Sequence, residues 1–382
     1  MSALHAQRHV FQTGLSLIEI MVALTLGIII MLGVTEVATN NSITRGEIER
    51  TGRQIESASY ALQQIENDLL SAGFWGEMGE QGVEIDTLNN AFPVDDACTA
   101  PTAAELAALP AVPVCPGLAA DSCDARVEMV RSTVFPVDGA DEAGSSCVVP
   151  KAGTDFLAIR RVSSCALLDT DGTDNTSCDD SAGNFHLQVN SCFDPLDDAY
   201  PLPGIDFRID KDLDNLNYPV RLSSCPILTA YTPPAATDRA PIYRFVSRVY
   251  FVSSIVDADG NEIDSRLVRA ELDLNQSTDD YDETELVEGA ELMSLEYGID
   301  SNGDGQIDVY TNAPVGVQWA DIVMVRISLV VRNLQPSAGF TDNKTYTVLG
   351  ATHTVPAAFA DHRRQVYTRT VSLRNVAGRR ET

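Results

Sequence analysis

The chain has 382 residues, which is enough for one large or two smaller domains with a sizeable apolar core. Lys and Arg together number 26 and Asp and Glu 55, so the formal net charge at pH 7 is −29. A surface of this sign repels phosphate backbones and therefore argues against nonspecific nucleic-acid binding.

An apolar run of 20 residues, Leu15 to Val34, follows a short polar segment at the N-terminus and carries a single charge, Glu19. A helix of this length spans roughly 30 Å, the thickness of the hydrocarbon core of a bilayer. The polar residues after the run lack the small-residue cleavage site of a secretory signal, so the run predicts an uncleaved membrane anchor. A carboxylate at membrane depth costs roughly 2.5–3.5 kcal/mol on insertion scales, so Glu19 indicates a role beyond anchoring.

These residues resemble a known signal. Gly14, an apolar residue and then Ser-Leu-Ile-Glu before a long apolar helix are similar to the class III signal of type IV pilins and type II secretion pseudopilins. The resemblance implies that a prepilin peptidase removes the leader, residues 1–14, by cleavage after Gly14 on the cytoplasmic side. Leu15, where Phe is more usual, would become the N-methylated first residue, and Glu19 would act in assembly. Residues 15–35 would then form the half of the helix that lies in the membrane and later in the filament core.

Apolar residues continue at helical spacing after this run. Ile48, Ile55, Leu62 and Leu69 recur every seven residues, and Thr51, Ala58, Ile65 and Ala72 lie three residues after each. The pattern predicts one continuous helix from about Leu15 to Ala72, with Gly73 as its C-cap. Its amphipathic half, residues 36–73, would cover a globular head, while charged residues such as Asp68 would lie on other faces. A free coiled coil is the alternative for this half.

The eight cysteines all lie between Cys98 and Cys225, and no two form a C-x-x-C pair. Zinc sites favour close Cys or His pairs, so the even number beyond a membrane anchor predicts disulfides formed in an oxidising periplasm. Buried free thiols are the alternative. The surrounding stretch, residues 93–240, is rich in Ala, Pro and Asp, and we expect a cysteine-rich insertion there. It holds three strand candidates, at 126–134, 155–162 and 184–189.

Strand-like sequence becomes regular after this stretch. The strand candidates are 243–256, 265–274, 292–299, 320–333, 344–350 and 365–375, and the Asp/Gly-rich turn at 257–264 makes the first two an antiparallel hairpin. We therefore predict an α+β fold of the type IV pilin kind. A long N-terminal helix would pack on one mostly antiparallel sheet of four to six strands, within a head that spans residues 74–382.

Several of these stretches resemble the PilW type of minor pilin. They are residues 72–76 (AGFWG), residues 285–308, the step from Trp319 to Asp321, and residues 363–375 (RRQVYTRTVSLRN). The resemblance implies a minor pilin that initiates or assembles the type IV pilus in a complex with other minor pilins and the major pilin. Before assembly the protein would be anchored in the inner membrane with its head in the periplasm, and it would then be incorporated into the pilus, or fimbrium, at the cell surface. A type II secretion pseudopilin and a tip-displayed adhesin that uses residues 93–240 remain alternatives.

One loop predicts a metal site. Asp300, Asn302, Asp304, Gln306 and Asp308 place oxygen ligands at alternate positions, with Gly305 at the sixth position, as in calcium-binding loops. The twelfth position, where an EF-hand has Glu, is Thr311, so another ligand or water must complete a calcium site. A turn that binds no ion is the alternative. The sequence contains no G-x-S-x-G, H-E-x-x-H, P-loop or G-x-G-x-x-G motif, and we expect no enzymatic activity.

Overall fold

The computed structural model describes residues 16–74, 137–138, 148–168, 178, 186–189, 207–210, 240–273, 280–314, 318 and 321–375. Gly14, Leu15, Trp319 and the strand candidate at 126–134 lie outside these residues. The chain divides into two units, residues 1–53 and residues 54–382, and each is described by itself.

Helix α1 extends from Leu17 to Ser71 without interruption, as the sequence predicted. It begins where the amide groups of Glu19 and Ile20 donate to the Ser16 carbonyl, at 3.0 and 3.2 Å. It ends at Gly73, whose φ of 70° is the left-handed conformation of a helix C-cap. No proline falls within the helix, so nothing removes a backbone donor along its length.

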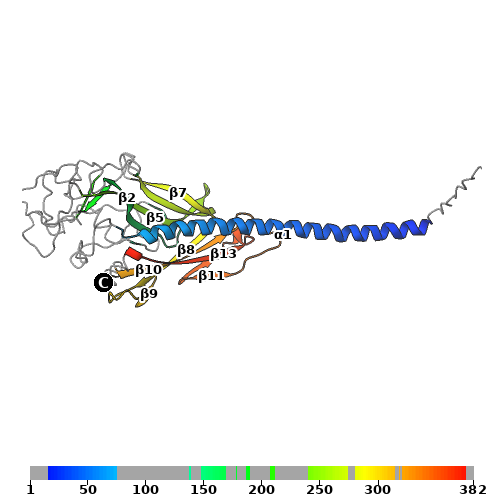
Figure 1. Cartoon of the computed structure of the whole chain (residues 1–382). Helices are drawn as coiled ribbons and strands as arrows, with labels where there is room; N and C mark the ends of the chain where they lie inside the picture. Colours follow the sequence, from blue (N-terminus) through cyan, green and yellow to red (C-terminus); the bar gives the residue numbers. More distant parts are fainter. Residues whose placement is uncertain are drawn as a thin grey trace, which may run out of the picture. The chain divides into compact units, whose positions relative to one another are not determined.

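The remaining described elements are strands and one short 3-10 helix (Figure 1). The strands are β1 (Val137–Asp138), β2 (Leu157–Leu168), β3 (His186–Val189), β4 (Phe207–Asp210), β5 (Ile242–Val256), β6 (Glu262–Asp273), β7 (Asp280–Glu288), β8 (Ala290–Ile299), β9 (Val309–Thr311), β10 (Ile322–Arg332), β11 (Thr345–Val348), β12 (Ala351–Thr354) and β13 (Arg364–Ser372), and the 3-10 helix is η4 (Ala357–Phe359). The predicted hairpin is confirmed as β5 and β6.

The strands form three sheets, and the prediction of one sheet of four to six strands was wrong. The first sheet has seven strands in the order β1-β2-β5-β3-β4, with β6 paired to β5 and β7 paired to β6. The second has four strands in the order β13-β10-β8-β9, and β11 pairs with β12 in the third. All of these pairings are antiparallel.

A single glycine separates the first sheet from the second. β7 ends at Glu288 and β8 begins at Ala290, and between them Gly289 has a φ of 78°. A Cβ atom at this position would lie 2.7 Å from the carbonyl oxygen of Arg332. Only glycine fits both this conformation and this close approach. The alternation of apolar and polar residues along the strands does not indicate that the chain passes from one sheet to the other here.

Part of the stretch predicted as an insertion belongs to the first sheet. β2, at Leu157–Leu168, pairs with β5 over most of its length, and β3 pairs with both β4 and β5. These strands correspond to the candidates at 155–162 and 184–189. Residues 93–240 therefore contribute strands to the sheet that carries β5, and they also contain the cysteines.

One apolar core lies between the C-terminal part of α1 and both large sheets (Figure 1). From the helix it contains Ala58, Leu62, Ile65, Leu69 and Ala72, which confirms this part of the predicted stripe. From the sheets it contains side chains that include Tyr250, Leu267, Met293, Tyr297, Ile327 and Val371. The prediction for Ile55 was wrong, because its side chain is 45% exposed.

Candidate functional site

Asp68 is a buried carboxylate on the face of α1 that packs on the sheets. Only 4% of the residue is exposed, so the expectation that Asp68 lies on another face was wrong. It lies three residues after Ile65 and four before Ala72, which is the spacing of one helical face. That spacing was readable in the sequence, but a charged residue was assigned to solvent by its chemistry.

Three side chains of the first sheet bind this carboxylate. Arg248 donates from Nη1 to both carboxylate oxygens, at 2.8 and 3.0 Å, and Arg161 donates from Nη2 at 3.2 Å. The hydroxyl of Tyr250 also donates to Asp68. A buried carboxylate is tolerated only when charges and donors of this kind replace its water. The arrangement therefore joins α1 to strands β2 and β5.

Glu271 on β6 extends the cluster across the sheet. Its carboxylate accepts from Nε of Arg248 at 2.9 Å and from Nη2 of Arg244 at 3.3 Å. Burial alone would lower the pKa of Arg248, but the carboxylates of Asp68 and Glu271 raise it above its usual value. Burial, with Asp68 beside it, raises the pKa of Tyr250. Arg248 therefore stays charged and Tyr250 stays a neutral donor throughout the physiological range.

Backbone hydrogen bonds continue this attachment beyond the end of the helix. The amide of Gly73 donates to the carbonyl of Arg160 at 3.1 Å, and the amide of Val162 donates to the carbonyl of Phe74 at 2.8 Å. At the other end of the packed segment, the buried side chain of Gln54 donates to the carbonyl of Val331 on β10. The helix is thus fixed in register on the sheets at Gln54 and, 14 residues further along, at Asp68.

A second buried carboxylate, Glu291, lies in the four-stranded sheet. Opposite it the pairing of β8 with β10 shifts by one residue, because Val330 pairs with Leu292 and Val331 with Ala290. Glu291 is therefore the extra residue of a β-bulge, a feature that redirects a side chain. Its carboxylate accepts from Nε and Nη2 of Arg364, at 2.6 and 2.8 Å.

Two more groups complete the environment of Glu291. Nε2 of His353 lies 2.8 Å from one carboxylate oxygen and Nε of Arg332 lies 3.4 Å from the other. Burial alone would raise the pKa of Glu291, but the hydrogen bonds and charges of His353 and Arg364 lower it to about 2. The cluster holds β8, β12 and β13 together from residues that are far apart in the sequence.

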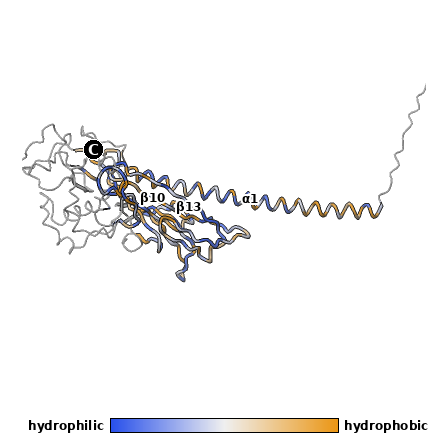
Figure 2. The backbone as a smooth tube through the Cα atoms, turned by 90° about the horizontal axis from the view of Figure 1, so that it is seen from below, coloured by the Kyte–Doolittle hydropathy of each residue, from blue (hydrophilic) through white to orange (hydrophobic). Residues whose placement is uncertain are grey.

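The first turns of α1 carry Glu19 and the apolar run. The helix is long and apolar enough to cross a membrane, and Figure 2 shows the hydrophobic colour concentrated in its N-terminal part. Thr25 and Thr35 donate their hydroxyl groups to carbonyl oxygens of the preceding turn, at 2.8–3.0 Å. These hydroxyls are therefore satisfied without water. Within the described residues the carboxylate of Glu19 has no hydrogen-bond or ion-pair partner.

The predicted calcium loop connects β8 to β9. The buried carboxylate of Asp300 accepts from the amides of Gly303, Asp304 and Gly305, at 2.9–3.2 Å. Asp308 accepts from the amide and hydroxyl of Ser301, at 2.9 and 2.7 Å. The loop is thus a closed turn in which side-chain oxygens bind backbone donors. Among the described residues, no three His, Cys, Asp or Glu side chains are gathered closely enough to hold a metal ion.

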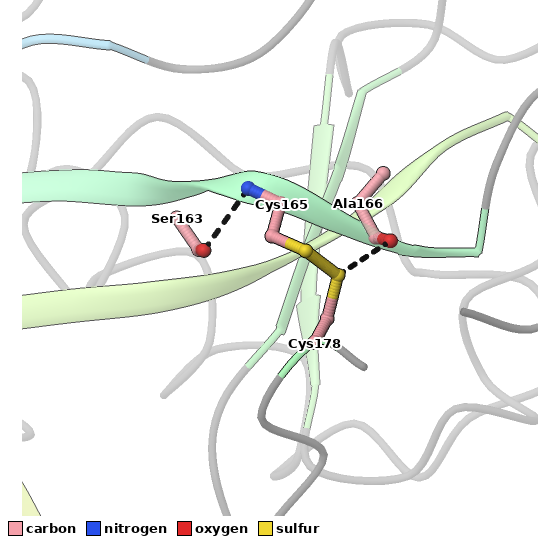
Figure 3. The surroundings of a disulfide bond; sticks show 4 residues. All are labelled: Ser163, Cys165, Ala166 and Cys178. Atoms are coloured by element: carbon pink, nitrogen blue, oxygen red, sulfur yellow. Dashed lines mark hydrogen bonds between the residues drawn. A yellow bond between two sulfur atoms is a disulfide. The ribbon is translucent and has the colours of Figure 1, made fainter. Parts of the chain in front are cut away.

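One disulfide lies in the described part of the chain, between Cys165 and Cys178 (Figure 3). Cys165 lies where the pairing of β2 with β5 shifts between Val162 and Ala166. Cys178 lies with its sulfur 3.0 Å from the carbonyl oxygen of Ala166. The other six cysteines lie outside the described residues.

The fold of the described residues defines a class of protein: a long N-terminal helix, apolar in its first half, whose C-terminal turns from Gln54 onward pack on antiparallel β-sheets. This confirms the α+β, pilin-like architecture. Residues 249–375 match the family model of PilW, the type IV pilus-assembly protein W. That segment contains Tyr250, Glu271, Glu291 and Arg364, and the resemblance to PilW-type pilins is thereby confirmed for this part of the chain.

The other comparisons add little. A type IV-like pilin from Thermus thermophilus is similar in structure, with 11% sequence identity and a TM-score of 0.20, over 35% of this chain and 78% of that chain. A search of curated proteins finds no match.

Proposed function

We propose that this chain is a minor pilin that acts in initiation or assembly of the type IV pilus, within a complex of minor pilins. The observation that carries the proposal is that one chain combines the match to the type IV pilus-assembly protein W family with an apolar N-terminal helix that bears Glu19. The family match favours pilus assembly over the related role in type II secretion.

In this proposal the apolar half of α1 first anchors the protein in the inner membrane, with the head in the periplasm. Prepilin peptidase cleaves after Gly14, and Leu15 becomes the methylated N-terminus. The carboxylate of Glu19 has no partner among the described residues and is therefore available to a neighbouring subunit. A pair between Glu19 and the N-terminal amine of that neighbour lowers the desolvation cost of both charges and sets the axial register of two apolar helices.

In the same proposal the head presents a rigid surface to neighbouring pilins. The clusters around Asp68 and Glu291 hold the helix and the sheets in one arrangement. These features support an interaction protein. We also propose that calcium binds one loop of that surface and stabilises it, and a calcium-binding experiment tests this part of the proposal. The ligands would be Asp300, Asn302, Asp304, Gln306 and Asp308.

The test of the assembly role is a Glu19→Ala variant in cells that produce the other minor pilins. We expect normal membrane insertion and head stability, but reduced co-purification with the other pilins. Glu19→Asp, which keeps the charge on a shorter side chain, should be intermediate. Glu36→Ala removes a carboxylate from the same helix beyond the apolar run and serves as the matched control. Wild-type co-purification of Glu19→Ala would contradict the proposed role.

Processing needs its own variant. Gly14→Glu should leave a precursor about 14 residues longer than the mature protein, which intact-mass measurement detects, and should block assembly. A mature mass unchanged by this substitution would mean that the N-terminal signal is an anchor and nothing more.

A further inference from the structure

Among the described strands, β13 forms one edge of the four-stranded sheet. Its nine residues pair with β10 in one unbroken register, and no other described strand pairs with it. Edge strands are usually protected by proline, a bulge or a charge that disfavours pairing with another chain. β13 has no proline and no register shift.

The backbone of β13 alternates between inward and outward hydrogen-bonding groups. The amide of Leu373 donates to Val323 and the amide of Asn333 donates to Arg363, both at 2.8 Å and both in the register of β10 with β13. In an antiparallel pair the bonded positions recur every second residue. The odd-numbered residues of β13 therefore bond to β10, and the even-numbered ones direct their amide and carbonyl groups away from the sheet.

Four of these even-numbered residues are exposed, namely Val366, Thr368, Thr370 and Ser372. Their backbone groups have no hydrogen-bond partner within the described part of the chain. Thr and Val are also residues that favour strands. The edge is therefore ready to accept a further strand along about seven residues.

β7 is an edge strand of the seven-stranded sheet with the opposite charge. Among the described strands it pairs only with β6, and like β13 it has nine residues. It carries five carboxylates and no basic residue: Asp280, Asp282, Glu283, Glu285 and Glu288. The segment 363–374, by contrast, has no carboxylate and four Arg, although the whole chain has a net charge of −29. Arg363, Arg369 and Arg374 are exposed, whereas Arg364 is buried against Glu291. Arg369 and Glu285 are 46% and 44% exposed at their side chains.

We propose that β7 of one copy of this protein adds as a strand to the free edge of β13 of a second copy. Two β7 strands repel each other by charge, and so do two β13 strands, so the complementary pairing is the one that charge selects. Because the two surfaces differ, each copy keeps one free edge and the contact can propagate from copy to copy. The proposal concerns the head alone and holds whether or not the protein enters a pilus.

The experiment is sedimentation velocity of the full chain in excess detergent over a range of protein concentrations. We expect the average mass to rise with concentration, and to fall again when 1 M NaCl screens the opposite charges. Thr370→Pro removes an outward amide while leaving every bond to β10 in place, and should raise the dissociation constant at least about tenfold. Thr370→Ala keeps that amide and should associate like the wild type.

A synthetic peptide with the sequence of residues 280–288 tests the same edge without any mutation. We expect it to return the wild-type chain to the monomer, while a peptide with Lys at the five acidic positions does not. In the associated form the amides of Thr368 and Thr370 should also become slow in hydrogen exchange. Three results would each overturn the proposal: a monomer at every concentration, equal association of the proline and alanine variants, or association that the acidic peptide leaves unchanged.

Discussion

The sharpest prediction concerns Asp68, because its burial was not expected from the sequence. Asp68→Asn keeps the shape of the side chain and removes its charge, which leaves Arg161 and Arg248 without that counter-charge. Removing one partner of a buried ion pair costs roughly 3–5 kcal/mol. Both arginine side chains are still 19% exposed, and Arg248 keeps Glu271. We therefore expect a loss at the lower end, about 3 kcal/mol.

Thermal unfolding of the full chain in detergent, followed by circular dichroism, measures this loss. At roughly 2 °C per kcal/mol for a domain of this size, the midpoint should fall by about 6 °C. Tyr250→Phe removes one hydrogen bond to the same carboxylate and should cost about 1 kcal/mol. The double variant should cost less than the sum of the two, because both changes act on one network.

Glu66 offers the matched control on the same helix. Its ion pair with Arg369, at 3.1 Å, is between side chains that are 46% and 30% exposed, so Glu66→Gln should change stability by less than about 1 kcal/mol. If Asp68→Asn melts with the wild type, or if Glu66→Gln is the less stable variant, the buried network does not fix the helix on the head.

Three other features give predictions of their own. The pKa of Glu291 is lowered to about 2, so its contribution to stability is complete above the unfolded-state pKa of 4.5 and is lost as the pH falls through 2. Glu291→Gln should remove about 3 kcal/mol of stability at pH 7 and should make the free energy of unfolding less dependent on pH in this window. Millimolar calcium should raise the melting temperature and Asp304→Ala should abolish that rise, whereas equal melting with calcium and with chelator would contradict a calcium site. Thiol titration of denatured, unreduced protein should find Cys165 and Cys178 blocked and two free thiols or fewer among the eight cysteines, whereas six or more free thiols would contradict the predicted disulfides.

The long helix and most strands of the described residues could be predicted from the sequence, because they depend on local periodicity. The absence of proline before residue 93 and the seven-residue recurrence of apolar side chains define α1. β5, β10 and β13 coincide with runs that are rich in β-branched and aromatic residues, which favour strands. The candidate assembly residue Glu19 was also visible, since a carboxylate in an apolar run is conspicuous.

Other features depend on which distant segments of the chain pack together, and local sequence patterns do not predict this packing. The division into sheets depends on Gly289, whose close approach to Arg332 exists only once β8 and β10 are paired. From the sequence alone, Glu291 resembles any other exposed acidic residue. In the structure the bulge directs its side chain toward Arg364 and His353. The pairing of Cys165 with Cys178 was one of many connectivities that eight cysteines allow.

By itself, the sequence determined the class of this protein, because the apolar run, Glu19 and the helical stripe are properties of consecutive residues. The tertiary structure alone decided which polar groups are buried and paired. Asp68 shows the physical reason: a carboxylate is placed in a core only if cations and donors from distant strands meet it there. Arg161, Arg248 and Tyr250 lie about 90 to 180 residues further along the chain, so only folding brings them to it.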